Sequence, residues 1–176
     1  DSLQGGRGAI WVHAVSVGEV LAARPLLAAL EARFPDRPLL LSTTTPTGHA
    51  VAQRSLSGTA RLFFAPFDWP GPVRRALDRL QPALLVLVET EIWPNLIHEA
   101  KRRGVRVAMV NGRISERSHR GYRRIRPFLR RVLREIDLFA MQGDAHAERI
   151  RDLGAPAERV QVSGNDIRKS LGTEKR

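Results

Sequence analysis

The sequence predicts an α/β fold, in which an open and mostly parallel sheet forms the middle layer of a three-layer α/β/α sandwich. Short apolar runs alternate with helical patterns along the whole chain, which is typical of a parallel sheet covered on both faces. The chain has 176 residues, of which 43% are hydrophobic. This length and composition predict one globular domain with a substantial core.

Seven segments are expected to form strands. Each is short and nearly continuous in apolar residues, as buried parallel strands are. The expected strands are residues 10–15, 39–43, 61–65, 84–88, 105–110, 138–141 and 160–163.

Prolines and capping residues mark the helix starts between these strands. Thr45 and Pro46 have the residue types of an N-cap and a first helical position, and they predict a helix that extends toward Ser55. Pro72 and Pro94 are expected to open two further helices in the same way.

The last expected helix begins at its cap, Asp144, and runs to Leu153, where Gly154 ends it. Residues 1–165 are assigned to a single domain. Residues 166–176 are polar, carry a run of charges and lack periodicity. They predict a tail or the start of an interdomain linker.

Positive charge dominates the composition, with 29 Lys and Arg against 18 Asp and Glu and a net charge of +11. Such a surface attracts polyanions, among them nucleic acid, anionic lipid and phosphorylated substrates. Nearly all the basic residues are arginine, which grips phosphate at two points. An arginine excess is also expected from a GC-rich genome, so both explanations stay open.

Cysteine is absent, which excludes disulfides, a thiolate nucleophile and a cysteine metal site, and favours the reducing cytoplasm. No apolar run approaches the roughly 18 residues of a membrane span. Any membrane contact of this chain is therefore expected at the surface. The five histidines are scattered without H-x-H or H-E-x-x-H spacing, so we expect no metal site and a chemistry based on carboxylates and arginines.

The loop after the first expected strand, residues 13–19, carries the acid Glu19 at the opening of a helix. It lacks both the dinucleotide fingerprint and the P-loop ending. Because an acid at this point would repel a bound phosphate, the carboxylate is expected to have a task of its own. Ser16 and Glu19 also match the S-x-x-E capping box, which merely satisfies the helix start. As a catalytic residue, Glu19 is expected to face an open cleft at the edge of the sheet.

A second loop, residues 88–95, places Glu89, Glu91 and Trp93 directly after another strand. Acids beside an aromatic ring at a strand's carboxyl end are typical of a sugar-binding rim. Glu91 is equally explained as a first-turn acid favoured by the helix dipole, and Trp93 as a packing residue.

A third loop, residues 111–118, precedes an arginine-rich segment, residues 122–134. That segment predicts one basic amphipathic helix suited to lipid headgroups or phosphates. The alternative is an arginine-decorated surface helix. Its expected apolar face consists of Phe128, Leu129, Val132 and Leu133.

Five motifs in order resemble the Kdo transferase family (Kdo is 3-deoxy-D-manno-octulosonic acid), whose members have the two-domain GT-B glycosyltransferase fold. The motifs are His-Ala-Val-Ser-Val-Gly-Glu at 13–19, Ser-Thr-Thr-Thr-Pro-Thr-Gly at 42–48, Pro-Phe-Asp at 66–68, Glu-Thr-Glu-Ile-Trp-Pro-Asn at 89–95 and Asn-Gly-Arg-Ile-Ser-Glu-Arg-Ser at 111–118. The resemblance covers residues 10–165. It implies that the chain is the amino-terminal, acceptor-binding domain, one Rossmann-like half of a GT-B fold.

The resemblance implies transfer of Kdo from the donor CMP-Kdo to a hydroxyl of the lipid A precursor, with inversion and without a metal or a further cofactor. By likeness to the family motifs, Glu19 is the general base, Glu91 the second functional acid and Glu89 a weaker candidate. The candidates for substrate binding are Ser16, Gly18, Trp93, Arg113, Arg117, Arg123, Arg126 and Arg130. The arginines among them are assigned to the acceptor's phosphates or to membrane headgroups.

The resemblance also implies a location on the anionic, cytoplasmic face of the bacterial inner membrane. A carboxy-terminal domain outside this chain would supply most nucleotide contacts, so the chain alone is expected to be inactive. Residues 164–168 match the family's corresponding stretch only in part. The alternatives are another GT-B sugar transferase or epimerase and, less favoured, a basic nucleic-acid-binding module. The chain shows no recognition-helix motif and a single tyrosine for base stacking, which disfavours nucleic acid.

Overall fold

The computed structural model describes residues 7–164, so the expected tail at 166–176 lies outside the described residues. Its centre is a seven-stranded sheet in the order β3-β2-β1-β4-β5-β6-β7, and every neighbouring pair is parallel. The strands are β1 Ala9–His13, β2 Leu39–Thr43, β3 Arg61–Phe64, β4 Pro82–Val88, β5 Arg106–Gly112, β6 Leu138–Met141 and β7 Val160–Val162.

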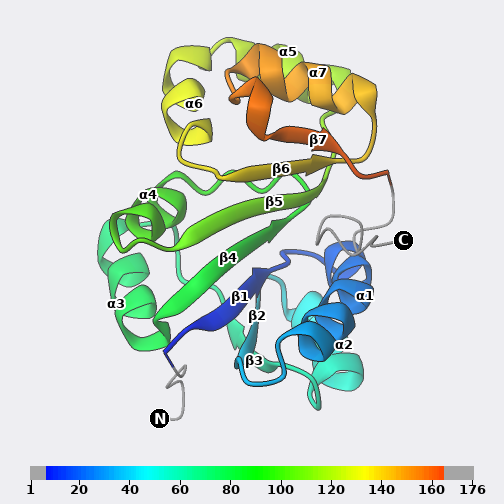
Figure 1. The fold of residues 1–176 in the computed structure, drawn as a ribbon, viewed down its shortest axis with the longest axis vertical. Coiled ribbons are helices and arrows are strands. Elements are labelled where there is room, and N and C mark those ends of the chain that lie inside the picture. Colours follow the sequence, from blue (N-terminus) through cyan, green and yellow to red (C-terminus); the bar gives the residue numbers. More distant parts are fainter. Residues whose placement is uncertain (1–6, 165–176) are drawn as a thin grey trace.

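Helices cover both faces of the sheet (Figure 1), which confirms the predicted α/β/α sandwich. Side chains of α1 and α2 pack on one face, and side chains of α3, α4, α6 and α7 pack on the other. The helices are α1 Val17–Arg33, α2 Pro46–Leu56, α3 Pro70–Leu80, α4 Pro94–Arg102, α5 Glu116–Arg123, α6 Arg126–Leu133 and α7 Asp144–Leu153, and a 3₁₀ turn, η1 Ala157–Arg159, precedes β7.

Successive residues of each strand point to opposite faces, so the continuous apolar runs fill two cores at once. In β1, Ile10 and Val12 belong to the core under α1 and α2, whereas Trp11 belongs to the core under α3 and α4. All seven expected strands are present. Several bounds differ by one or two residues; for example, β1 already ends at His13, and β5 continues to Gly112 through Asn111, whose φ is 56°.

Helix starts follow the sequence signals at most positions. Thr45 accepts a hydrogen bond from the Gly48 N–H as the N-cap of α2, and α4 begins at Pro94 as expected. The expected start at Pro72 is wrong, because α3 already begins at Pro70. Both prolines fit within a first turn, where a backbone N–H has no helical partner to lose.

The N-cap of the final helix lies one residue earlier than expected. Gly143 occupies the N-cap of α7, and Asp144 is the first helical residue. Gly154 ends the helix at a φ of 114°, as predicted for a glycine in the left-handed region.

The expected single basic helix over 122–134 is wrong, because the chain forms two short helices, α5 and α6, with a break at Arg124 and Ile125. Pro127 lies in the first turn of α6, where its missing N–H and ring are tolerated; inside a longer helix they would not be. Leu129, Val132 and Leu133 are buried as expected. Phe128 is 53% exposed, so its assignment to the apolar face is wrong.

Among residues 7–164, the structure contains no helix that is both long and apolar enough to cross a bilayer.

Candidate functional site

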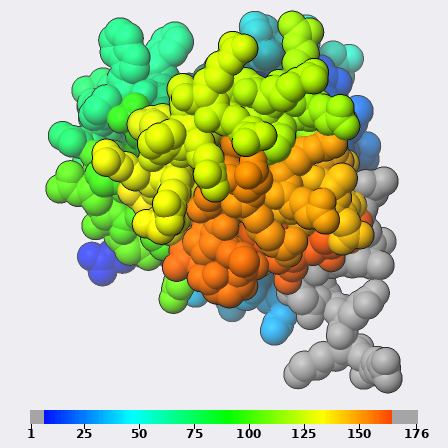
Figure 2. Space-filling view, turned by 90° about the horizontal axis from the view of Figure 1, so that it is seen from above, coloured from blue at the N-terminus to red at the C-terminus, as the bar shows by residue number. Residues whose placement is uncertain are grey.

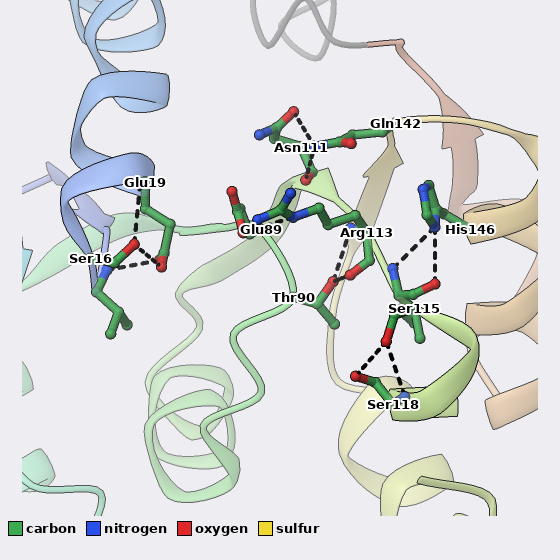
Figure 3. Close-up of polar contacts among 12 residues, drawn as sticks. Ser16, Glu19, Glu89, Thr90, Asn111, Arg113, Ser115, Ser118, Gln142 and His146 are labelled. Atoms are coloured by element: carbon green, nitrogen blue, oxygen red, sulfur yellow. Dashed lines mark hydrogen bonds and ion pairs between the residues drawn. The ribbon is translucent and has the colours of Figure 1, made fainter. Parts of the chain in front are cut away.

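The three loops singled out in the sequence meet at one edge of the sheet. They follow β1, β4 and β5, which are neighbours in the strand order. Because these strands are parallel, their carboxyl ends share an edge, and open α/β sheets bind ligands there. Figure 3 shows polar residues of all three loops along this edge, from Ser16 and Glu19 to Arg113 and Ser115.

Glu19 turns back onto the start of its own helix (Figure 3). One carboxylate oxygen accepts a hydrogen bond from the Val15 N–H at 2.8 Å, and the other accepts from the Ser16 hydroxyl at 2.8 Å. The Ser16 oxygen in turn accepts from the Glu19 N–H at 3.4 Å. Ser16 is therefore the N-cap of α1, and the capping interpretation holds with one difference: the carboxylate reaches the N–H of Val15 instead of that of the cap.

The expectation that Glu19 faces an open cleft is wrong, because its side chain is buried, with 6% exposure. Burial has an electrostatic consequence. Loss of water around the carboxylate raises the pKa of Glu19, the hydrogen bonds from Val15 and Ser16 lower it, and the nearby carboxylates of Glu91 and Glu89 raise it further. The net direction is upward, which makes the ionised carboxylate a stronger base than an ordinary glutamate.

The threonine-rich motif at 42–48 holds the first loop in place. The hydroxyls of Thr44 and Thr45 both donate to the Val15 carbonyl at 3.2 Å. Gly48 lies so close that an added Cβ would be 3.4 Å from the Val15 oxygen and 2.8 Å from the Thr45 hydroxyl. Two motifs that are separate in sequence thus form one packed unit around the Glu19 loop.

Trp93 connects the second loop to the buried His13 at the end of β1. Its indole N–H donates to the Glu91 carboxylate at 2.7 Å. Its ring meets the His13 ring edge to face, with centroids 4.7 Å apart at 82°. Trp93 is therefore a packing residue, as the alternative interpretation held, and its indole also fixes the direction of the Glu91 carboxylate.

His13 is a candidate that sequence reasoning missed. It ends β1, is fully buried, and shares a 2.8 Å hydrogen bond between its Nδ1 and the Ser42 hydroxyl, which also accepts from the Trp11 indole at 2.7 Å. Burial lowers the pKa of His13 to about 4, so the ring is neutral at pH 7. Its Nε2 has no hydrogen-bond partner among the described residues. A histidine at the end of an apolar strand was the available signal.

Glu89 and Arg113 join the second loop to the third. The Arg113 Nε donates to the Glu89 carboxylate at 3.1 Å. The Thr90 hydroxyl also binds the backbone of Arg113: it donates to the Arg113 carbonyl at 2.6 Å and accepts from the Arg113 N–H at 3.0 Å. Glu89 adopts a φ of 61°, a conformation that costs a residue with a side chain energy.

The Pro-Phe-Asp motif at 66–68 has a structural role. The Asp68 carboxylate accepts from the backbone N–H groups of Asn95 at 3.1 Å and Leu96 at 2.8 Å. These groups lie in the first turn of α4, whose own N-cap, Trp93, supplies no side-chain hydrogen bond. Asp68 therefore caps α4 from a distant segment, which positions the loop that carries Glu91.

The remaining candidates are spread over two edges of the sheet. Arg113 and Arg117 are exposed near the carboxyl edge, and Gly18 is exposed in the first turn of α1. Arg123 lies 3.7 Å from the Asp152 carboxylate. Arg126 and Arg130 line a hollow beside the carboxyl end of α7. The structure therefore does not bring these last three arginines together with Glu19.

Metal ligands are not gathered at this edge. Among residues 7–164, no group of three or more His, Cys, Asp or Glu side chains is arranged to hold a metal ion.

The chain is similar to proteins of one family. A family model described as 3-deoxy-D-manno-octulosonic-acid transferase (kdotransferase) matches residues 2–167. The 3-deoxy-D-manno-octulosonic acid transferase of Haemophilus influenzae is 35% identical over 164 residues, and that of Bordetella pertussis is 39% identical over 159 residues. A bifunctional glycosyltransferase/methyltransferase of Fusobacterium nucleatum is 38% identical over 168 residues.

These alignments cover 88 to 94% of this chain but only 26 to 38% of the relatives. The chain thus spans about a third of the length of the curated proteins that it matches.

Solved structures with a similar fold include UDP-GlcNAc 2-epimerase from Neisseria meningitidis, with a TM-score of 0.62 at 11% identity. The alignment covers 93% of this chain and 48% of that one. An S. aureus MnaA structure with UDP gives a TM-score of 0.62 at 14% identity. At such identities the similarity establishes the fold alone, and it confirms the α/β class predicted from sequence.

Proposed function

The chain belongs to the 3-deoxy-D-manno-octulosonic-acid transferase family, and from this premise we propose that it is the amino-terminal, acceptor-binding part of a Kdo transferase. The proposed enzyme transfers Kdo from CMP-Kdo to a hydroxyl of the lipid A precursor. In this proposal residues 1–165 form the acceptor domain. A carboxy-terminal domain, contributed by the rest of the protein, makes most contacts with the nucleotide.

Transfer with inversion requires three coupled changes at the reacting atoms. The acceptor oxygen forms a bond to the anomeric carbon of Kdo, the bond from that carbon to the phosphate oxygen of CMP breaks, and the acceptor hydroxyl loses its proton. In the proposed mechanism the Glu19 carboxylate takes this proton. The raised pKa of Glu19 supports this role, since a stronger base removes a hydroxyl proton more readily.

The burial of Glu19 restricts how an acceptor reaches it. Its two oxygens each accept one hydrogen bond, from Val15 and from Ser16, and a carboxylate oxygen can accept a second. An acceptor hydroxyl must come within about 3 Å of a carboxylate oxygen to be deprotonated. We propose that it arrives at the small exposed part of the side chain, beside Ser16 and Gly18.

Glu91 is proposed to support Glu19 through its charge. The Trp93 indole holds the Glu91 carboxylate at 2.7 Å, and this carboxylate contributes to the raised pKa of Glu19. The edge of the Trp93 ring and the exposed guanidinium groups of Arg113 and Arg117 are proposed to contact the acceptor, with the arginines on its phosphates. Glu89 then serves to position Arg113.

The proposed location is the cytoplasmic face of the bacterial inner membrane, with the protein bound at its anionic surface. A net charge of +11 supports attraction to such a surface.

One observation carries the proposal: a buried acid of raised pKa lies within the family-matched segment, at the carboxyl edge where open sheets bind ligands. The test is incubation of the full-length protein with CMP-Kdo and the lipid A precursor, followed by mass spectrometry. The expected result is a product heavier by one or more Kdo units.

A panel of other nucleotide sugars, with CMP-Kdo omitted, separates the rival functions. Transfer from a different donor would contradict the proposed substrate and indicate another GT-B transferase. Conversion of a nucleotide sugar without an acceptor would indicate an epimerase. Salt-dependent binding of duplex DNA together with indifference to the lipid A precursor would indicate a nucleic-acid-binding module.

A further inference from the structure

A hollow of about 600 Å³ opens between α6, the end of α7 and the turn η1. Figure 2 shows the surface of α6, in yellow, beside the orange surface of α7 and the residues that follow it. Arginine dominates the lining, and one carboxylate, that of Glu158, lies among the arginines. The arginines are Arg126, Arg130, Arg134, Arg151 and Arg159.

This hollow lies away from the candidate active site. α7 starts after β6 at the carboxyl edge of the sheet and β7 begins at Val160, so the residues between them lie at the amino edge. Arg134 precedes β6 and Arg159 precedes β7, which places both at the starts of strands. Glu19 and the loops around it follow the ends of strands. The hollow is therefore a separate feature on the opposite edge.

Three of the arginines are held in place by backbone oxygens. The Arg126 Nε donates to the Asp152 carbonyl, and an Arg151 nitrogen donates to the Val160 carbonyl at 3.0 Å. An Arg159 nitrogen donates to the carbonyls of Arg134 at 2.8 Å and Ile136 at 3.0 Å. Carbonyl partners fix the guanidinium groups without neutralising their charge, so the positive field stays available to a ligand.

The side chains of the other two arginines, Arg130 and Arg134, make no hydrogen bond or ion pair with the residues that the structure describes. The stem of Arg130 rests against Gly154, where an added Cβ would lie 2.7 Å from the Arg130 Cγ. Gly154 also has a φ of 114°. This glycine therefore both ends α7 and leaves room for the Arg130 side chain at the wall of the hollow.

One acid beside the hollow, Asp152, is engaged by other side chains. Asp152 is bound by His119 at 2.8 Å and lies 3.7 Å from Arg123. Some arginines elsewhere on the surface pair with carboxylates, as Arg103 does with Asp78 at 2.9 Å. What sets this cluster apart is its density, because five arginines and a single carboxylate, that of Glu158, line one hollow.

We propose that the hollow is a binding site for a phosphate-bearing anion, of the phosphomonoester or diphosphate class. Guanidinium groups bind phosphate oxygens through paired hydrogen bonds. Several such groups around one concave site suit a compact, doubly charged phosphate better than the extended backbone of a nucleic-acid duplex. The phosphate can belong to a free metabolite or to a lipid headgroup. The proposal does not depend on the transferase activity, because the hollow and Glu19 lie on opposite edges.

The test measures binding of inorganic pyrophosphate to the full-length protein by titration calorimetry. Arg130→Gln combined with Arg134→Gln removes two charges four residues apart and keeps the Arg130 stem that packs on Gly154. Arg75→Gln with Arg79→Gln is the matched control, since it removes the same charge at the same spacing from exposed positions of α3. Thermal unfolding followed by circular dichroism checks that both variants fold.

Saturable binding that weakens at least tenfold in the α6 variant and stays unchanged in the control is the expected result. A second arm replaces pyrophosphate with neutral vesicles and with vesicles that contain phosphatidic acid. Binding confined to the phosphatidic acid vesicles and lost in the α6 variant supports the same site with a lipid headgroup as its source. Equal losses in the two variants, no binding in either arm, or a preference for duplex DNA that depends on the same arginines would overturn the proposal.

Discussion

The two edges of the sheet use charge in opposite ways. At the carboxyl edge, Glu19 is buried and each of its oxygens accepts a hydrogen bond. At the amino edge, Arg130 and Arg134 are exposed around an open hollow. Burial changes the proton affinity of a group, whereas exposure leaves its charge intact but open to screening by salt. This difference is consistent with the proposed roles, proton transfer at the carboxyl edge and anion binding at the amino edge.

The largest effect is expected from removal of the buried acid. Glu19→Gln in the full-length enzyme should lower the rate of Kdo transfer about a hundred- to ten-thousandfold, the usual contribution of a general base. The amide keeps the shape of the side chain, so the fold should persist. Transfer rates with CMP-Kdo and the lipid A precursor measure the effect.

Glu31→Gln is the matched control, because Glu31 is an exposed acid on the same helix. Its rate should stay close to that of the wild type. Near-normal transfer by a folded Glu19→Gln enzyme would show that Glu19 serves only as a helix cap and not in proton transfer.

A smaller effect, on stability, is expected from the buried hydrogen bonds of Ser42 near the carboxyl edge. Ser42→Ala removes the hydroxyl that accepts from Trp11 and bonds to His13. Because both partners are buried, we expect the free energy of unfolding to fall by about 1–3 kcal/mol. Urea denaturation measures it, with Ser57→Ala at an exposed position as the control. A change as small as that of the control would show that the buried network contributes nothing to the edge.

The smallest effect is expected among the exposed charges. Arg123→Gln breaks an ion pair with Asp152 in which the side chains are 63% and 41% exposed. Exposed pairs contribute little, so the free energy of unfolding should change by less than about 0.5 kcal/mol. Urea denaturation at low and high salt checks this. A decrease in the free energy of unfolding above about 1 kcal/mol would show that the exposed charges of this region stabilise the fold. That result would contradict the view that these charges serve binding and contribute little to stability.

The sequence predicted the sheet well because its signals are local. Each buried strand is an apolar run, and the starts of α2 and α4 carry their prolines at the expected positions. The arginine-rich segment misled the prediction for the same reason. Its apolar spacing continues across a break at Arg124 and Ile125, and only the packed structure reveals two helices and an exposed Phe128.

The site was predicted in part. The three loops do meet at one edge, as their positions after parallel strands implied. The direction of Glu19 is set by local hydrogen bonds from Val15 and Ser16, and the S-x-x-E pattern indicated it. The capping of α4 by Asp68 and the hydrogen bond between His13 and Ser42 depend instead on contacts between distant segments. Spacing within a loop carries no information on such contacts, so neither the burial of Glu19 nor the amino-edge hollow could be derived from the sequence.

The pH dependence of kcat/KM for Kdo transfer tests the role of Glu19 most directly. A base must be ionised, so activity should fall as the pH drops through the pKa of Glu19, and burial places this limb above the ordinary glutamate value. Glu91→Gln removes a carboxylate that raises this pKa, so it should move the limb to lower pH. A limb that stays in place in Glu91→Gln, or that persists in Glu19→Gln, would contradict the account.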